Sequence, residues 1–386
     1  MKRQVLRRGN RPKIVVYSLD NETDACAIIR ILAPMLAKDF DVVWATKRDR
    51  SGLSIDLDIA QRADLIIIQR HFPAASTEKA LRAILRLKVP IVYDLDDLFL
   101  DVPPLHPHYN DLSKRVPYIK WILKEADLVT VSTTPLQEAL KQYTARPIHV
   151  LPNLVDWSLF DAPPRPRNRQ FNLLISGTST HQGDWSLIEE PLAEILNIHR
   201  ENVNAIFFGE LPKRFSDHPS VRLINFQPDY RGYSLRLREL DIHAALIPLE
   251  DTKFNRCKSN IKWLEYSAAG IAGVFSDLLP YSSSIRNRET GLLVDNTADA
   301  WFRGMEQLLA NPEATFSMIE NARREVREYH SIGSISDKYL TVFNDLLGQK
   351  HVRNLFSGLP ILPARLGAHA HQFLGRHILW RFNRKH

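Results

Sequence analysis

The sequence has very little cysteine and no long apolar run, and both shortages exclude whole classes of protein. Cys26 and Cys257 are its only cysteines in 386 residues, too few for a disulfide framework or a thiolate metal site. No window approaches the roughly 18 uncharged apolar residues of a membrane span. The apolar run after the basic N-terminus is too short for a signal peptide. We therefore expect a protein of the reducing cytoplasm.

The sequence also lacks the short motifs of several enzyme classes. It contains no GxGxxG dinucleotide fingerprint, no GxxxxGK[ST] phosphate loop, no GxSxG nucleophile elbow and no HExxH zinc motif. Its 14 histidines are scattered without metal-ligand spacing. These absences leave the function to be inferred from polar residues that follow predicted strands.

The positive charge of the chain lies in its two ends. Residues 1–13 and 351–386 each carry six Lys or Arg and no acid, and removing those twelve from 51 leaves 39 basic against 44 acidic residues. The net acidic charge of residues 14–350 argues against a surface that binds nucleic acid. The basic, aromatic tail 351–386 is instead suited to an anionic membrane surface, or it packs on the body or stays disordered.

Short apolar runs alternate with helical segments along the chain, which predicts two doubly wound parallel sheets. Residues 161–170 are rich in proline and arginine and are the best candidate for a linker. We predict an N-terminal domain over 13–160 and a C-terminal domain over 171–350. The predicted strands are Lys13–Leu19, Asp41–Ala45, Ala63–Gln69, Ile91–Asp94, Ala126–Ser132 and Pro147–Leu151, then Phe171–Ser176, Asn204–Gly209, Val221–Phe226, His243–Pro248, Ala272–Phe275 and Gly291–Val294.

The stretch from Phe254 to Asp277 carries the strongest functional signal. A helix that starts near Lys258 and stops at Gly270 would place Lys258, Lys262 and Glu265 on one face. Ser259 and Asn260 would stand at the helix start, where backbone N–H groups favour an anion. Two cations and a helix start suit a phosphate group, and the carboxylate suits sugar hydroxyls. A surface helix with a Lys–Glu pair would give the same pattern.

Three further clusters follow predicted strands, where open α/β sheets bind their ligands. The first is an aspartate cluster in YDLDDLFLD, which suits Mg²⁺, a general base or a helix cap. The second is SGTSTHQGD, in which Gly177 allows a phosphate to approach the backbone and His181 can pair with Asp184. The third is LPNLVD, with Asn153. The aspartates of the first cluster are Asp94, Asp96, Asp97 and Asp101.

Four segments together resemble the GT-B-fold retaining glycosyltransferases of the family 4 type, over about residues 13–345. They are ADLVTVSTTPL, HVLPNLVDWSLF, LRELDIHAALIP and KSNIKWLEYSAAGIAGVFSD. YDLDDLFLDVP and GTSTHQGD look like the subgroup often found in cell-surface polysaccharide and O-antigen biosynthesis. The resemblance implies two Rossmann-like domains that face each other across a cleft, with a nucleotide-sugar donor held mainly by the second.

The resemblance also assigns roles to residues of this chain. Glu265 would bond the ribose, and Phe226 and Gln227 would meet the base. The diphosphate would lie between Lys258 and Ser259 on one side and Gly177 and Thr178 on the other, with Asn260 and Lys262 also at the donor. His181 stands where the family often has an Arg/Lys pair, and Cys257 where it has a second glutamate. Asp94, Asp96 and Asp97, with Asn153, would face the acceptor.

These roles predict transfer of a hexose-type unit to a hydroxyl of a glycan or a lipid-linked acceptor. Lys258 would stabilise the leaving diphosphate, and Asp94 and Asp97 would orient the acceptor or act as base. No metal or other cofactor is expected, in keeping with GT-B enzymes. Two other hypotheses stay open: a metal-dependent phosphotransferase or hydrolase that uses Asp94 to Asp97, and a non-catalytic module that binds sugar nucleotides or glycans.

Overall fold

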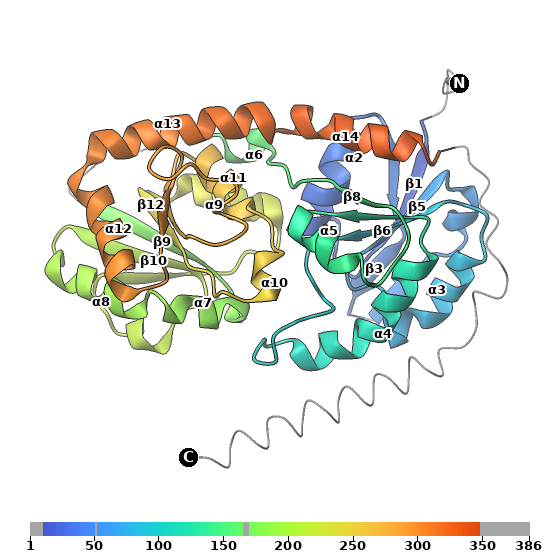
Figure 1. Cartoon of the computed structure of the whole chain (residues 1–386), viewed down its shortest axis with the longest axis horizontal. Helices are drawn as coiled ribbons and strands as arrows, with labels where there is room; N and C mark the ends of the chain where they lie inside the picture. Colours follow the sequence, from blue (N-terminus) through green and yellow to red (C-terminus); the bar gives the residue numbers. More distant parts are fainter. Residues whose placement is uncertain (1–10, 51, 165–169, 348–386) are drawn as a thin grey trace, which may run out of the picture.

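The computed structural model describes residues 11–50, 52–164 and 170–347, which form two α/β units (Figure 1). The basic tail and the centre of the predicted linker lie outside these residues. The first unit is built on a six-stranded sheet in the order β2-β1-β5-β6-β7-β8, and each of its pairings is parallel. Its strands are β1 (Lys13–Tyr17), β2 (Asp41–Trp44), β5 (Leu65–Gln69), β6 (Ile91–Leu95), β7 (Leu128–Val131) and β8 (Ile148–Val150).

The second unit repeats this plan with a different strand order, β11-β10-β9-β12-β13-β14, again with parallel pairings. Its strands are β9 (Phe171–Gly177), β10 (Val203–Gly209), β11 (Val221–Asn225), β12 (Ala244–Ile247), β13 (Ala272–Ser276) and β14 (Leu292–Val294). Every residue of β5, β6, β7, β12 and β13 is buried, as expected for central strands covered by helices on both faces. The predicted pair of doubly wound sheets is therefore confirmed.

Helices cover both faces of each sheet. The first unit has a continuous helix made of α1 (Ala25–Ala27), η1 (Ile28–Leu32) and α2 (Ala33–Leu36), then η2 (Ile59–Arg62), η3 (Ala75–Thr77), α3 (Glu78–Leu85), α4 (Tyr109–Glu125) and α5 (Thr134–Leu140). Helix α6 (Trp157–Phe160), which follows β8, packs against the second unit (Figure 1). The second has η4 (Ser179–His181), α7 (Gln182–Ser186), α8 (Glu189–Ile198), η5 (Lys213–Phe215), α9 (Tyr230–Glu239), α10 (Lys253–Arg256), α11 (Ile261–Ala268), α12 (Ala298–Ala310) and α13 (Pro312–Tyr329). None of the helices in the described ranges is long and apolar enough to cross a membrane.

The structure contains several elements that were not predicted from the sequence. One is the antiparallel hairpin of β3 (Thr46–Asp49) and β4 (Gly52–Ile55). Another is α4, which contains Pro117 and still buries Leu112, Val116 and Ile119 on one side. A third is α14 (Ile332–Asn344) at the end of the described chain. Proline inside a helix interrupts its hydrogen bonds, so the local pattern of α4 argued against the helix that tertiary packing supports.

Helix α14 returns to the first unit although its residues lie in the range predicted for the second domain. Its Tyr339 and Phe343 join the apolar cluster that contains Ile14 and Val16 of β1. In Figure 1, α13 lies over the second unit and α14 continues over the first. Where the chain passes between the units, the Val155 N–H donates to the His330 carbonyl over 2.9 Å. The first core is thus completed by the end of the described chain.

Candidate active site

The strand orders show that each sheet has one switch point. It is the pair of neighbouring strands whose following connections run to opposite edges of the sheet. In the first sheet it lies between β1 and β5, which are followed by Asp20 and Arg70. In the second it lies between β9 and β12, which are followed by the loop at Gly177 and by Glu250. Ligands of open α/β sheets bind beyond the strand ends at such points. Two candidate half-sites therefore lie at the carboxyl ends of the two sheets.

Polar contacts join these two edges to each other. The Thr133 hydroxyl, just after β7, donates to the Cys257 carbonyl over 2.8 Å. Lys253 of α10 lies 3.3 Å from Asp101 of the first unit. The Phe254 and Cys257 side chains belong to the apolar cluster of the first unit, and Figure 1 shows α10 on the side of the second unit that faces the first. The segment 253–260 is therefore the place where the half-sites meet.

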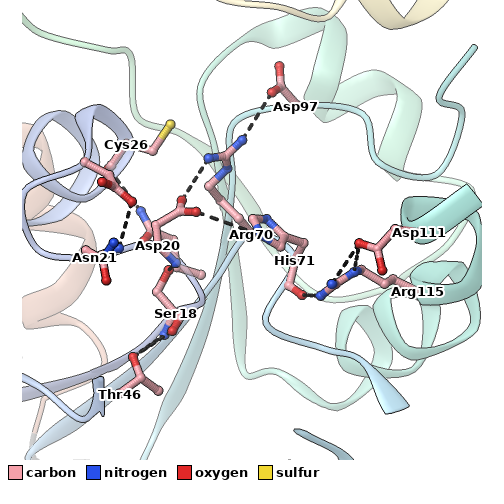
Figure 2. Close-up of polar contacts among 12 residues, drawn as sticks. Ser18, Asp20, Asn21, Cys26, Thr46, Arg70, His71, Asp97, Asp111 and Arg115 are labelled. Atoms are coloured by element: carbon pink, nitrogen blue, oxygen red, sulfur yellow. Dashed lines mark hydrogen bonds and ion pairs between the residues drawn. The ribbon is translucent and has the colours of Figure 1, made fainter. Parts of the chain in front are cut away.

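Arg70 is the centre of the half-site on the first sheet. Its guanidinium lies 2.8 Å from a carboxylate oxygen of Asp20, 2.9 Å from one of Asp96 and 3.6 Å from one of Asp97. Figure 2 shows Arg70 between Asp20 and Asp97, with His71 beside it. Arg70 has φ = 51°, a left-handed conformation that is unusual for a side chain of this size. Its backbone is held there because its N–H bonds the Asp94 carbonyl and its carbonyl accepts the Tyr93 hydroxyl.

This cluster places three carboxylates around one guanidinium cation. Burial and the neighbouring Asp96 raise the pKa of Asp97 to about 6, against the opposing effects of Arg70 and Lys258. Burial and Arg70 lower the pKa of His71 to about 4, so its imidazole is neutral at physiological pH. Asp97 therefore titrates just below neutral pH, within the electrostatic influence of Lys258 in the opposite unit.

Asp94 lies apart from this cluster although it is close in sequence. It is 2% exposed, belongs to β6 and pairs with the buried Arg30 at 2.6 Å. The Thr130 hydroxyl donates to the same carboxylate over 2.7 Å. The fourth aspartate, Asp101, pairs with Lys253 as described above. The four predicted aspartates thus divide among three cations, and only Asp96 and Asp97 join the Arg70 cluster.

In the second unit, the loop after β9 places His181 against a buried carboxylate. Its Nδ1 lies 2.8 Å from an oxygen of Asp184, and burial together with Lys262 lowers the pKa of His181 to about 3. The neutral ring then donates its Nδ1 proton to Asp184 and presents Nε2 as an acceptor. Gly177 is needed here, since a Cβ at this residue would lie 2.7 Å from the His181 ring. The predicted pairing of His181 with Asp184 is confirmed, and His181 adds no positive charge.

The predicted helix start near Lys258 is wrong, and the structure has two helices here. Helix α10 ends at Arg256 and α11 begins at Ile261, so Lys258, Ser259 and Asn260 occupy the turn between them. The Asn255 side chain holds this turn through bonds to Asp184 and to the Glu250 carbonyl.

The Lys258 ammonium stands over the Phe254 ring, 5.3 Å from its centre. It forms no ion pair with any other described residue. Asn260 precedes α11 without a side-chain cap and instead donates to the Ser284 hydroxyl over 3.1 Å. An unpaired ammonium group and an uncapped helix start therefore lie together.

Helix α11 carries the other two predicted residues, the half-buried Lys262 and the buried Glu265. Lys262 donates to the Ser176 carbonyl over 2.7 Å, and burial lowers its pKa to about 8. Glu265 accepts hydrogen bonds from Tyr230 (2.7 Å) and Tyr233 (3.2 Å), yet burial raises its pKa to about 7. Gly270 ends this helix with φ = 68°, as predicted. The segment thus holds a buried carboxyl and a half-buried ammonium at the end of β9.

The remaining predicted donor residues are Thr178, Phe226 and Gln227, and their side chains make fewer contacts. Thr178 bonds Thr180 through their hydroxyls over 3.0 Å. Phe226, which is 57% exposed, and Gln227 are both exposed in the loop that leads from β11 to α9. That same helix carries the two tyrosines that bond Glu265. An exposed aromatic ring on this loop is available for stacking against a planar ligand.

Sequence reasoning missed several residues of these half-sites. Arg70 and Asp20 follow predicted strands in the same way as Asp96, so the carboxyl-end rule could have found them. Tyr230 and Tyr233 are three residues apart on a helix, which signals a shared face. Arg30 gave no signal, because it lies within an apolar helical run. Within the described residues no group of three or more His, Cys, Asp or Glu side chains is placed to hold a metal ion.

Two doubly wound six-stranded sheets joined at their carboxyl edges, with a final helix that returns to the first unit, define the GT-B fold. No protein-family model and no curated protein sequence matches the chain. The fold is similar to that of sucrose-phosphate synthase from Thermosynechococcus elongatus, with a TM-score of 0.64 at 13% identity over 87% of this chain and 99% of that one.

Two further similar structures are described as complexes with a nucleotide. Anabaena HepE in complex with UDP-glucose has a TM-score of 0.62 at 13% identity, over 86% of this chain and 99% of that one. The pneumococcal O-GlcNAc transferase GtfA in complex with UDP and GlcNAc has a TM-score of 0.54 at 13% identity, over 78% and 62%. At this level of identity the comparisons establish the fold of the chain.

Proposed function

We propose that the protein is a glycosyltransferase that moves a sugar from a UDP-sugar to a hydroxyl of a glycan or a lipid-linked acceptor. The observation that carries this proposal is the unpaired Lys258 ammonium beside the uncapped start of α11, in the segment that joins two GT-B half-sites. Two proteins of similar fold, HepE and GtfA, are described in complex with UDP and a sugar, which supports this choice of donor.

The chemical demand of such a transfer falls on the leaving group, because the diphosphate gains negative charge as the bond to the sugar breaks. Lys258, the Ser259 hydroxyl and the first N–H groups of α11 supply positive potential at one place. Lys262 adds a half-buried ammonium at the end of β9. Glu265 offers carboxylate oxygens to ribose hydroxyls, and Phe226 offers its exposed ring to the base.

The acceptor half of the proposal rests on the Arg70 cluster. Asp96 and Asp97 lie beyond the end of β6, and Asp97 is close enough to Lys258 for the two charges to interact. An acceptor hydroxyl held by Asp97 would then lie next to the departing diphosphate. Retention of anomeric configuration, membership of glycosyltransferase family 4 and a place in polysaccharide biosynthesis remain parts of the proposal, supported by the sequence motifs.

The proposed reaction uses no metal ion, since lysines and a helix start carry the charge at the diphosphate. The metal-dependent alternative is not favoured, because Asp94 is paired with Arg30 and Asp96 with Arg70. Guanidinium groups already neutralise the carboxylates that such a metal would need. The proposal therefore predicts full turnover in the presence of EDTA.

The decisive experiment incubates the intact protein with a panel of UDP-sugars and of lipid-linked or oligosaccharide acceptors. Released UDP and the mass of the product are measured with and without EDTA. Acceptor-dependent UDP release that survives EDTA supports the proposal. Loss of activity with EDTA would favour the metal-dependent enzyme, and nucleotide binding without any turnover would favour a non-catalytic module. Lys258→Met, with the exposed Lys79→Met on α3 as its control, then assigns the activity to this site.

A further inference from the structure

Arg30 is a fully buried cation with a defined set of partners. Its guanidinium binds both oxygens of Asp94, through Nη2 at 2.6 Å and Nε at 3.3 Å. Its Nη1 donates to the Leu151 carbonyl and, over 3.2 Å, to Oδ1 of Asn153. A guanidinium group has hydrogen-bond donors and no acceptor. The Asn153 side chain must therefore turn its oxygen, and not its NH₂ group, towards Arg30.

This orientation decides what Asn153 does on its other side. Its Nδ2 lies 2.8 Å from the Ser259 hydroxyl, and an amide nitrogen can only donate. Asn153 is 7% exposed, and turning the amide over would set its NH₂ group against the guanidinium. The bond from Asn153 to Ser259 therefore has one direction, with the serine oxygen as the acceptor.

The Ser259 hydroxyl consequently keeps its own proton for a different partner. Among the described residues, the hydrogen-bond partner of this hydroxyl is Asn153. Ser259 is half-buried and follows Lys258 in the turn before α11. The Ser259 O–H is therefore a second donor next to the unpaired Lys258 ammonium group. Two such donors suit an anionic ligand.

We propose that Asp94, Arg30 and Asn153 form a directional hydrogen-bond relay that sets Ser259 as a donor to the diphosphate of the bound nucleotide. This inference rests on the proposed function, because the ligand is the donor of that reaction. In the relay, Asp94 fixes Arg30, Arg30 fixes the Asn153 amide, and the amide fixes the serine hydroxyl. The three residues belong to the first unit and Ser259 to the second.

The relay gives Asp94 and Asn153 a role different from the one predicted from their positions in the sequence. Both carboxylate oxygens of Asp94 are already bonded, by Arg30 and by Thr130. It is a positioning residue that acts through Arg30, and the acceptor is left to Asp96 and Asp97. Asn153 likewise acts on the ligand through Ser259.

The substitution Asn153→Asp tests the relay, because it exchanges the donating NH₂ group for an acceptor oxygen at nearly constant shape. The new carboxylate keeps an acceptor for Arg30, while the Ser259 hydroxyl turns to donate to it and no longer to the ligand. We expect UDP to bind about 10- to 100-fold more weakly in calorimetry, the loss expected for one hydrogen bond to a charged group. Asn110→Asp, on the exposed side of α4, is the control for added charge and should bind UDP as the wild type does.

A double-mutant cycle separates the relay from a general effect of the substitution. In the Ser259→Ala background the hydroxyl is gone, so Asn153→Asp should weaken UDP binding by no more than about threefold. An equal loss in both backgrounds, or a Ser259→Ala variant that binds like the wild type, would overturn the relay. A wild-type protein that binds neither UDP nor UDP-sugars would instead reject the proposed function, so the two failures are distinguishable.

Discussion

Glu265→Gln is the substitution that most directly tests the electrostatics of the candidate site. Glu265 is 5% exposed, and burial raises its pKa from an ordinary 4.5 to about 7, although two tyrosine hydroxyls bond it. At 1.36 kcal/mol per pKa unit, this shift corresponds to about 3 kcal/mol between the two protonation states. The variant keeps the shape of the side chain and removes its titration.

The sign of the effect follows from proton binding. Between pH 4.5 and about pH 7 the native state keeps the Glu265 proton that the unfolded chain has lost, so the native state binds more protons. Stability from this group therefore falls as the pH rises through that window. Between about pH 5 and about pH 8 the wild type should lose roughly 2.5 kcal/mol of unfolding free energy through Glu265, and the variant should lose none of it.

The assay is urea unfolding of both proteins, followed by circular dichroism at a series of pH values. The difference in unfolding free energy between variant and wild type cancels the titration of other groups, including the buried histidines. Glu239→Gln is the matched control, because Glu239 is exposed and pairs with Arg236 at 3.2 Å. If the Glu265→Gln and wild-type curves run parallel from pH 5 to 8, the carboxyl is already ionised in the native state and the reasoning fails.

Three other predictions address the remaining charges. Arg70→Gln should lower the unfolding free energy at neutral pH by about 3 kcal/mol, because three aspartates lose their shared cation. The exposed Arg86→Gln is the control. Equal unfolding free energies of the two variants in urea would contradict this prediction. Lys258→Met should weaken UDP binding by about tenfold or more in calorimetry. Lys79→Met, at an exposed residue of α3, should leave UDP binding unchanged, and equal losses would refute the assignment. A chain that ends at Gln349 should co-sediment less with anionic liposomes, because it lacks the basic tail; unchanged sedimentation would contradict a membrane role for the tail.

The sheets were predictable because their strands carry a local signal. A run such as LIIIQ in β5 is apolar throughout and is buried throughout, so composition alone identifies a central strand. Helices α4 and α14 lack such a signal. Helix α4 contains a proline, and α14 is defined by its contacts with β1, which is more than 300 residues away in the sequence. Long-range packing of this kind leaves little trace in a local pattern.

In the candidate site, likewise, the position of a residue after a strand could be predicted from the sequence, whereas its side-chain partner could not. Asp96 and Asp97 follow β6 and reach the Arg70 cluster, as the carboxyl-end rule predicts. Asp94 still belongs to the strand and meets a buried arginine 64 residues earlier. The spacing of the aspartates is visible in the sequence, but their partners are brought together only by the fold. Those partners separate a positioning carboxylate from the ones at the acceptor half-site.

Cys257 shows how the fold can change the role of a position within a motif. Its side chain is buried in the apolar cluster that includes Phe99 of the first unit, and its carbonyl accepts the Thr133 hydroxyl. Burial raises the pKa of the thiol to about 11, and Asp97 and Asp101 act in the same direction. A glutamate here would bury a carboxylate among apolar groups and beside two aspartates, an arrangement that strongly disfavours the charged form. Position 257 therefore serves the junction of the two units, and in the proposed transfer the contacts with the sugar fall to residues outside this position.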